Sequence, residues 1–310
     1  ISEGGYQLCL VINDENKLIG IITDSDIRKA LVKNYSLTSQ VSQIMNKKPI
    51  VVSPLLSDEE AQQIMKLNHI FHLPIVNDNG IINGLHVAEY LYSDSVKSEV
   101  FVIMAGGKGK RLMPLTQTIP KPMLPIRGKP NLQHIIERAK VDGFHKILIS
   151  VNYLSEVIVD YFKNGEKFGV EIDYIYEEKP LGTAGALNKI PKDLSKSYMI
   201  VTNGDVLTDA SYSDLLNSAK KLNCDGMMAV QFQKWQNPFA VIESNGSELI
   251  SLKEKPIFES QVNAGIYVLG PKIKELIKED TFLDMPDLFN KKLSKKMNLK
   301  VFPLHESWID

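Results

Sequence analysis

Short apolar runs alternate with amphipathic stretches over the last two thirds of the chain. The strand-like runs are residues 100–105, 146–151, 170–177, 198–205 and 226–232, and the helical stretches are residues 131–143, 155–165 and 212–223. The helical stretches repeat their apolar side chains at the period of an amphipathic helix. Strands separated by helices of this length form β-α-β units, so the pattern predicts an α/β fold with a mostly parallel sheet.

Residues 240–256 break this alternation. Two runs of alternating apolar and polar side chains flank Asn245-Gly246. Asn-Gly between such runs is a strong signal for a tight turn. We therefore expect an antiparallel hairpin inserted into the α/β region.

The first third of the chain contains a short internal repeat. Residues 10–20 (LVINDENKLIG) and residues 74–84 (PIVNDNGIING) both place Asn-Asp between two strand-like runs. A helix is expected after each copy, within residues 20–31 and 84–91. Chance similarity between two short turn-bearing segments is the alternative interpretation.

The second copy is preceded by a strand and a helix within residues 51–70. Ser57 and Glu60 have the spacing of a capping box at the start of that helix. The first copy lacks this preamble, so residues 1–91 are expected to form a repeat pair truncated at its start. Polar residues 92–98 are interpreted as a linker to a second domain at residues 99–310.

Composition narrows the functional classes. Of 310 residues, 44% are hydrophobic, and 36 basic residues nearly balance 37 acidic ones, giving a net charge of −1. A general nucleic-acid binder usually has a basic excess, and no apolar run approaches the ~18–20 residues that span a bilayer. Cys9 and Cys224 have no metal or redox spacing, so we expect reduced thiols in a cytoplasmic protein.

The chain starts at Ile1 and stops at Asp310 without an end signal, so we expect both natural termini to lie beyond it.

A glycine-rich loop directly follows the strand at residues 100–105. It reads Ala105-Gly106-Gly107-Lys108-Gly109-Lys110-Arg111. Glycines let the backbone approach a ligand and direct N–H groups at an anion, and the three basic side chains add positive charge. The loop lacks the Gly-Lys-Ser/Thr ending of a Walker A loop, and Leu112 replaces the third glycine of a dinucleotide fingerprint. A tight basic surface turn is the alternative.

Four prolines within twelve residues stiffen the segment that follows, from Pro114 to Pro125. Such a segment can hold Lys121 towards the glycine-rich loop. A proline-rich connector carrying a solvated lysine is the alternative.

These motifs together resemble those of sugar-1-phosphate nucleotidylyltransferases. The resemblance begins with AGGKGKRLMPLT and PKPMLPIRGKP and continues in order through EEKPLGTAGAL (177–187), TNGDVLTD (202–209), EKP (254–256), VNAGIYVL (262–269) and SWID (307–310). It implies a Rossmann-like, GT-A-like domain with a mixed, mostly parallel sheet. The repeat in residues 1–91 resembles a pair of CBS domains, which implies a smaller α+β domain before it.

The reaction implied by the resemblance joins a nucleoside triphosphate and a sugar 1-phosphate to give a nucleotide sugar and pyrophosphate. The attacking phosphate oxygen is already anionic, so positioning, charge neutralisation and Mg²⁺ should carry catalysis without a general base. The resemblance implies that Asp205 and Asp310 hold the metal. A strand-end turn residue and a chain-terminal residue are the respective alternatives.

The remaining roles are also implied by the resemblance. Arg111 and Lys121 should contact the nucleotide phosphates, and Lys255 should hold the sugar phosphate; with Asp205 they form the expected catalytic set. The nucleotide-binding residues expected are Ala105, Gly106, Gly107, Lys108, Gly109, Lys110, Glu177, Gly182 and Thr183, and the sugar-binding residues are Glu254, Asn263 and Gly265.

Base choice depends on Glu177, which stands where relatives using uridine or thymidine nucleotides often carry Gln. A carboxylate can accept from both N1–H and N2–H of guanine, so Glu177 or Glu178 favours GTP. A solvated glutamate, with UTP, CTP or dTTP as substrate, is the alternative. The resemblance implies a hexose or amino-hexose 1-phosphate used for surface-glycan or nonulosonic acid precursors.

Two positions depart from the family pattern. Lys110 replaces the usual Thr, and Ala240 stands where relatives usually have Gly. The Cβ of Ala240 restricts the approach of a sugar hydroxyl to the backbone, so the identity of the sugar is open.

In the first repeat, Thr23 and Asp26 match positions that bind phosphate and ribose in CBS domains holding adenine nucleotides. Helix capping explains the same residue types equally well. Val87 and Tyr90 stand at the corresponding positions of the second copy, so no second matching site is expected. The resemblance also implies a homo-oligomer. A nucleotide-sensing protein with a degenerate transferase domain is the alternative function.

Overall fold

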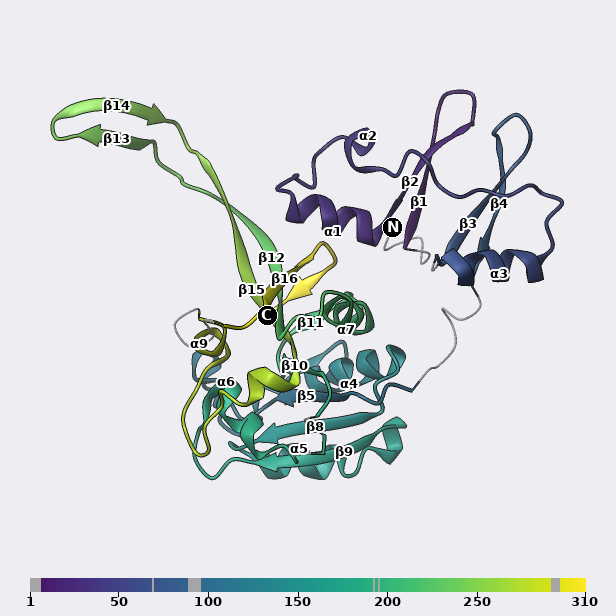
Figure 1. Ribbon diagram of the computed structural model, residues 1–310. Coiled ribbons are helices and arrows are strands. Elements are labelled where there is room, and N and C mark those ends of the chain that lie inside the picture. The colour runs from purple at the N-terminus through teal and green to yellow at the C-terminus, as the bar shows by residue number, and fades with distance from the viewer. Residues whose placement is uncertain (1–6, 69, 89–95, 192, 195, 291–295) are drawn as a thin grey trace. The chain divides into compact units, whose positions relative to one another are not determined.

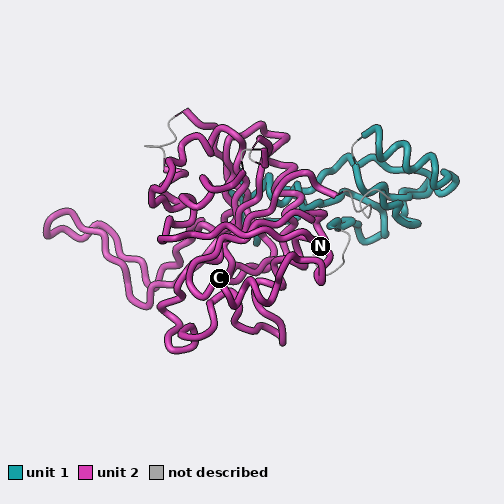
Figure 2. Tube along the Cα trace, turned by 90° about the horizontal axis from the view of Figure 1, so that it is seen from below, with its two compact units in different colours: residues 1–95 teal, residues 96–310 magenta. Residues whose placement is uncertain are grey.

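The computed structural model describes residues 7–68, 70–88, 96–191, 193–194, 196–290 and 296–310 (Figure 1). The chain divides into two compact units, Ile1–Ser95 and Val96–Asp310 (Figure 2). The division lies within the segment interpreted as a linker, whose residues 92–95 lie outside the described residues, as does Tyr90. No helix among the described residues is long and apolar enough to cross a bilayer.

Among its described residues, the first unit contains two antiparallel strand pairs and three helices. These are β1 (Leu8–Ile12), β2 (Leu18–Thr23), α1 (Asp24–Val32), α2 (Val41–Ile44), α3 (Asp58–Asn68), β3 (His72–Val76) and β4 (Ile82–Val87), with β1 paired to β2 and β3 to β4. The Asn13 side chain accepts hydrogen bonds from the backbone of Glu15 and Lys17, and Asn77 does the same for Asn79 and Ile81. The repeat therefore reproduces one turn with the same hydrogen bonds.

The prediction of a helix within residues 84–91 is wrong for residues 84–87. This segment continues strand β4, and the Ala88 N–H extends the pairing by donating to the Phe71 carbonyl. Residues 89–91 lie outside the described residues. The capping box at Ser57 is confirmed: Glu60 accepts from the Ser57 N–H and hydroxyl, and these bonds lower the pKa of Glu60.

The second unit is built on a mixed seven-stranded sheet in the order β16-β12-β15-β10-β5-β8-β9. Its strands are β5 (Val100–Met104), β8 (Lys146–Val151), β9 (Glu171–Tyr176), β10 (Met199–Asn203), β12 (Gly226–Gln236), β15 (Ile257–Leu269) and β16 (Leu299–Leu304). β10, β5, β8 and β9 are mutually parallel, whereas β15 is antiparallel to both its neighbours. The mixed, mostly parallel α/β sheet expected from the sequence is confirmed.

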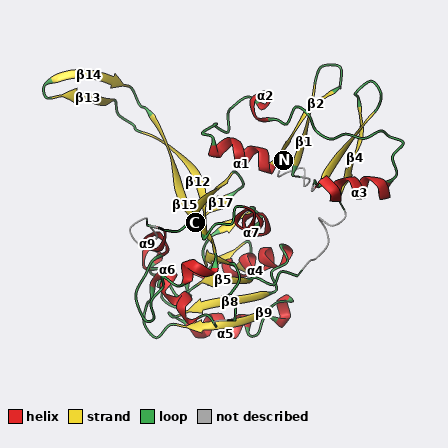
Figure 3. Cartoon of the chain, in the orientation of Figure 1, coloured by secondary structure: helices red, strands yellow, loops and turns green. Residues whose placement is uncertain are grey.

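Both faces of this sheet are buried. In β5, Phe101 and Ile103 belong to one apolar cluster and Val100 and Val102 to the other. The covering helices are α4 (Asn131–Val141), α5 (Ser155–Phe162), α6 (Gly182–Gly185), α7 (Tyr212–Lys221), α8 (Pro271–Lys274) and α9 (Met285–Phe289) (Figure 3). Burial on both faces explains why the strand sequences are continuously apolar.

One strand pair continues far beyond the sheet. β12 and β15 stay paired from Gln231↔Val262 to Gln236↔Ile257, and the hairpin of β13 (Val241–Asn245) and β14 (Glu248–Lys253) follows at the tip. We call residues 231–262 the arm, and Figures 1 and 2 show it projecting from the body of the second unit. The hairpin expected around Asn245-Gly246 is confirmed.

Phe101 tests the core of the second unit. Its fully buried ring packs against Phe144 and Tyr212, with centroids 5.4 and 4.8 Å apart. Phe101→Ala should lower the free energy of unfolding by about 3–5 kcal/mol, because the ring leaves a cavity. Urea unfolding followed by tryptophan fluorescence measures it, since Trp235 and Trp308 both lie in this unit. Half-exposed Leu222 is the control: Leu222→Ala should change this energy by less than about 0.5 kcal/mol, and equal losses would contradict the packing.

Candidate functional site

A cavity of about 560 Å³ lies beyond the carboxyl ends of β5 and β10. It is lined by Met104, Ala105, Gly106, Gly107, Gly109, Lys110, Arg111, Leu112, Lys121, Pro122, Glu177, Pro180, Gly182, Thr183, Asn203, Gly204, Asp205, Phe282 and Asp284. Ligands of open α/β sheets bind at this edge of the strands. The structure thus brings the glycine-rich loop, Lys121, Glu177 and Asp205 around one cavity. Lys108 is exposed and is not part of the lining.

The glycine-rich loop is held by Thr116, which the sequence reasoning missed. The fully buried Thr116 hydroxyl donates to the Gly109 carbonyl at 2.9 Å. Gly109 has φ +57°, and a Cβ there would lie 2.9 Å from Thr116 Cγ2. Both the left-handed backbone and this close approach require glycine. Exposed Arg111 and Lys110 follow in a short 3₁₀ turn at the mouth of the cavity.

Lys121 lies between the carboxylate of Asp205, which lines the cavity, and that of Asp310, which is not part of the lining. Its Nζ is 2.5 Å from Asp205 Oδ2 and 3.7 Å from Asp310 Oδ1. These side chains are partly exposed, with Asp310 the most open at 45%. One cation therefore offsets two like charges that face the same space.

Asp205 and Asp310 are distant in sequence and meet through a short strand pair. β11 (Leu207–Thr208) pairs antiparallel with β17 (Trp308–Ile309), so the residues just outside this pair lie close together. Asn131 Nδ2 also donates to the Asp205 carbonyl at 3.0 Å. The position of the Asp205 carboxylate is therefore fixed from both sides of the cavity floor.

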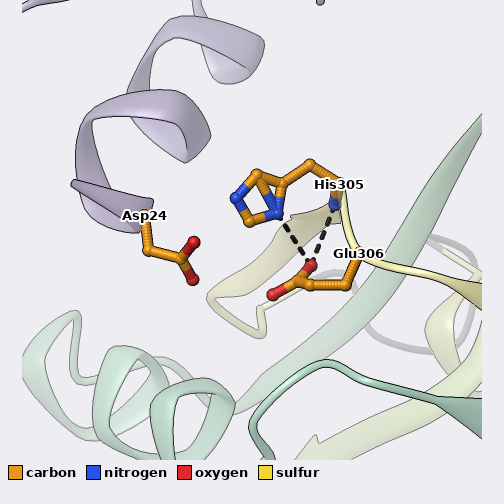
Figure 4. A group of neighbouring side chains, drawn as sticks. All are labelled: Asp24, His305 and Glu306. Atoms are coloured by element: carbon orange, nitrogen blue, oxygen red, sulfur yellow. Dashed lines mark hydrogen bonds and ion pairs between the residues drawn. The ribbon is translucent and has the colours of Figure 1, made fainter. Parts of the chain in front are cut away.

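The turn before β17 contains His305 and Glu306, which Figure 4 draws with Asp24 of the first unit. Glu306 Oε2 accepts from the His305 backbone N–H at 2.9 Å and lies 2.9 Å from His305 Nδ1. This contact lies within the connection from β16 to β17. Within its own unit, Asp24 accepts from Arg28 Nη2 at 2.8 Å.

Glu177 is half-buried, and both of its carboxylate oxygens are engaged. Ser150 Oγ donates to Oε1 at 2.7 Å, and the Leu181 N–H donates to Oε2 at 3.0 Å. Glu177 thus joins the end of β8 to the loop before Gly182. Two of about four acceptor positions of the carboxylate are used, which leaves capacity for a ligand. Its neighbour Glu178 is exposed.

Asp284 is a second pocket residue that the sequence reasoning missed. Its Oδ1 accepts from the Thr183 N–H at 3.0 Å and from the Thr183 hydroxyl at 3.3 Å. Gly182 has φ +78°, and a Cβ there would lie 2.5 Å from the Leu283 carbonyl oxygen. The loop carrying Gly182 and Thr183 is therefore positioned by the segment that precedes α9.

The residues expected at the sugar separate into two groups. Asn263 and Gly265 lie where β15 enters the sheet: Asn263 Oδ1 accepts from the Gly265 N–H at 3.0 Å. A Cβ on Gly265 would lie 2.8 Å from Nδ2 of Asn203, which lines the cavity. Glu254 and Lys255, by contrast, are exposed on the arm and do not line the cavity.

Thr23 and Asp26 of the first unit form a capping box at the start of α1. Asp26 Oδ2 accepts from the Thr23 N–H at 3.0 Å and from its hydroxyl at 2.7 Å. A separate cavity of about 230 Å³ in this unit is lined mainly by apolar residues of β2, α1 and α2, and neither Thr23 nor Asp26 lines it. The contacts present are those that the capping interpretation expects.

Comparison with known proteins gives two family matches. The nucleotidyl transferase family model matches residues 100–310, and the CBS domain model matches residues 1–33 and 41–85. Both resemblances drawn from the motifs are therefore confirmed.

Individual relatives differ in the nucleotide that they use. The chain is 31% identical over 231 residues to a UTP–glucose-1-phosphate uridylyltransferase from Synechocystis sp., and 33% identical over 216 residues to a mannose-1-phosphate guanyltransferase from Yarrowia lipolytica. Each alignment covers 67% of this chain and 59% of the relative. The structure of HddC from Yersinia pseudotuberculosis complexed with GMP-PN matches with a TM-score of 0.53 and 28% identity, over 68% of this chain and 93% of that one.

Gly106 and Gly107 provide a matched test of the loop geometry. A Cβ on Gly106 would lie 2.9 Å from Glu177 Oε1, whereas a Cβ on Gly107 meets nothing within 4 Å. Gly106→Ala should lower the free energy of unfolding by about 1–3 kcal/mol relative to Gly107→Ala, because it disturbs the Ser150–Glu177 hydrogen bond. Urea unfolding compares the two variants. Equal stabilities would show that Glu177 moves aside at no cost.

Proposed function

The chain belongs to the nucleotidyl transferase family through residues 100–310, and we propose that it transfers a nucleoside monophosphate from a nucleoside triphosphate to a sugar 1-phosphate. The products are a nucleotide sugar and pyrophosphate. The observation that carries the proposal is that Lys121 and Asp205 line the cavity beside the glycine-rich loop, with the Asp310 carboxylate 3.7 Å from the Lys121 ammonium.

The chain's own residues neutralise the charge of the two anionic substrates and position them for reaction. A phosphate oxygen of the sugar 1-phosphate attacks the α-phosphorus, the bond to the bridging oxygen breaks, and pyrophosphate leaves with the electron pair. No proton has to move at the attacking oxygen, so the work is to hold two anions together. Backbone N–H groups of the glycine-rich loop face the triphosphate, and Arg111 stabilises the charge that develops on the leaving pyrophosphate.

Asp205 and Asp310 fit a magnesium ion. Their carboxylates already surround a position held by a positive charge, the Lys121 ammonium. Mg²⁺ prefers one or two carboxylates together with phosphate oxygens, and this donor set provides the carboxylates. Mg²⁺ bound there would neutralise charge on the triphosphate.

Lys121 then has two successive partners. While the carboxylates lack another cation, its ammonium pairs with Asp205 and Asp310. Were their charge neutralised by a bound metal ion, the Lys121 side chain, which lines the cavity, would be free to contact the phosphates of a nucleotide bound there. Its proline-flanked 3₁₀ turn (Lys121–Met123) keeps its backbone fixed throughout.

We propose that the nucleotide is GTP and that Glu177 binds its guanine base. The carboxylate lies in the cavity lining, whereas Glu178 is exposed. Hydrogen bonds from Ser150 and Leu181 hold its orientation and leave acceptor capacity for N1–H and N2–H. The guanine nucleotide analogue in the HddC structure supports this choice, and the uridylyltransferase relative supports the alternative, UTP.

The function of the first unit is a separate proposal. By its resemblance to CBS domains it would bind an adenine nucleotide and associate with a second copy. The bond between Thr23 and Asp26 is a helix cap, so a nucleotide at these residues would have to share or replace it.

Pyrophosphate release tests the reaction and the base together. The full chain is assayed with Mg²⁺, hexose and amino-hexose 1-phosphates, and each of GTP, UTP, CTP, ATP and dTTP; GTP should give the highest kcat/KM. Glu177→Gln should lower kcat/KM for GTP by about 10–200-fold and raise it for UTP, because the amide suits uracil better.

Glu178→Gln is the matched control and should leave the ratio of GTP to UTP turnover unchanged. A wild-type preference for a pyrimidine nucleotide would overturn the assignment of the base. No release with any pair would overturn the proposed reaction.

Lys121→Met tests the exchange of partners. In nucleotide-free protein, Mn²⁺ should bind about tenfold more tightly, because the competing ammonium is gone. Turnover should nevertheless fall by about 10²–10³, because a phosphate contact is lost. Calorimetric Mn²⁺ titration and steady-state rates measure these opposite changes.

The control is Lys129→Met, which removes an exposed lysine paired with Glu137 and should leave both quantities unchanged. Weaker Mn²⁺ binding by Lys121→Met would contradict a site shared by the ammonium and the metal ion.

A further inference from the structure

Two short helices that begin beside the cavity, α6 and α9, cap each other. The first N–H groups of a helix have no acceptor within that helix. The Thr183 N–H, in the first turn of α6, is accepted by Asp284 Oδ1 at 3.0 Å. The Met285 N–H, which begins α9, donates to Thr183 Oγ1 at 2.8 Å. Each helix therefore takes a cap from a residue that lies 101 or 102 positions away in the chain.

Asp284 stands at the N-cap position of α9, yet its side chain makes no cap hydrogen bond to the described residues of that helix. An aspartate at an N-cap ordinarily accepts from the second or third N–H of its own helix and stabilises it by about 1 kcal/mol. Here the carboxylate accepts from the N–H and the hydroxyl of Thr183 instead. The side chain thus holds the opposite segment of the cavity lining rather than its own helix.

The backbone of Leu283 extends this contact. Its carbonyl accepts from the Ala184 and Gly185 N–H groups at 2.9 and 3.0 Å, and its N–H donates to the Leu181 carbonyl at 2.9 Å. We call residues 181–185 the capped loop. Residues 283–285 therefore hold the capped loop at both of its ends.

The capped loop in turn holds Glu177. The Leu181 N–H donates to Glu177 Oε2 at 3.0 Å, and Leu181 is itself only 2% exposed. The other carboxylate oxygen of Glu177 is held separately, by Ser150 of β8 at 2.7 Å. The orientation of the Glu177 carboxylate therefore depends on two anchors, of which one belongs to the capped loop.

We propose that Asp284 is a positioning residue that sets nucleotide selectivity without touching the base. It holds the capped loop, and the capped loop holds Glu177 in the orientation in which its carboxylate accepts from the base. The assignment of Glu177 to the base rests on the proposed function, whereas the reciprocal caps do not. Loss of Asp284 frees the capped loop and one Glu177 anchor, while the contact between Lys121 and Asp205 is independent of it.

Asp284→Ala in the full chain tests this role. The readout is the ratio of kcat/KM for the preferred nucleotide to kcat/KM for the second-best one, so it does not depend on which base is preferred. The ratio should fall about tenfold, mainly through a higher KM for the preferred nucleotide, because a displaced acceptor loses contact with the correct base. A smaller fraction of folded enzyme lowers both rates alike, so an unchanged ratio would overturn the proposal.

Asp284→Asn separates a hydrogen bond from a charge. The amide keeps a carbonyl oxygen for the Thr183 N–H, so the ratio should stay within about twofold of the wild-type value. A ratio as low as that of Asp284→Ala would show that the charge acts directly on a ligand and would overturn the positioning role. The matched control is Asp287→Ala, which removes an exposed carboxylate from the first turn of α9 and should leave the ratio unchanged.

A double-mutant cycle tests whether Asp284 acts through Thr183. Thr183→Val removes the hydroxyl that joins the two helices and should itself lower the ratio. Because both changes disrupt one contact, the loss in the double variant should be smaller than the product of the two single losses. Losses that multiply, or no loss in Thr183→Val, would show that Asp284 does not act through this contact.

Calorimetric binding of GTP and UTP, without sugar 1-phosphate, separates this inference from the proposed reaction. A wild-type protein that binds one nucleotide more tightly but releases no pyrophosphate would end the proposed reaction. The ratio of the two dissociation constants would then decide the role of Asp284, and Asp284→Ala should again lower it about tenfold. Equal binding of both nucleotides by the wild type, or binding of neither, would overturn the role of Asp284.

Discussion

The Lys121 ammonium, held between Asp205 and Asp310, is the contact around which the cavity is organised. Two carboxylates that face one space repel each other, and only a cation between them makes the arrangement stable. The three side chains come from three distant parts of the chain, so this contact joins the proline-rich segment, the end of β10 and the residue after β17. The glycine-rich loop is packed on the same floor, because Gly109 lies against both Thr116 and Lys121.

The fold of the second unit could be predicted because its signals are local and repeated. Strands buried on both faces are continuously apolar, as in Val100–Met104, and the helices between them are amphipathic. The Asn-Gly hairpin was equally local. The structure of residues 84–87 could not be predicted from such local signals. They form a strand and not the expected helix, because Gly84 and Leu85 pair with Ile75 and Pro74. The spacing of apolar residues does not reveal this pairing.

The cavity was predictable only where strand ends and motifs coincide. The glycine-rich loop and Asp205 directly follow apolar strands, so their place at one edge follows from a parallel sheet. Asp284 could not be found in this way, since its partner Thr183 lies 101 residues earlier. The hydrogen bond from Ser150 to Glu177 was hidden for the same reason, since the two residues lie 27 positions apart, and together with the bond from Leu181 it gives Glu177 a role in holding the loop before Gly182.

The direction of the arm is the feature that the sequence conceals most completely. Alternation and the Asn-Gly turn specify a hairpin but not where the hairpin points. The cations at the cavity are Lys110, Arg111 and Lys121, and Lys121 is already paired with two carboxylates. A second anionic substrate needs a further positive charge. Because Lys121 is engaged by Asp205 and Asp310, the cavity can join two anionic substrates only when another cation takes over these two carboxylates.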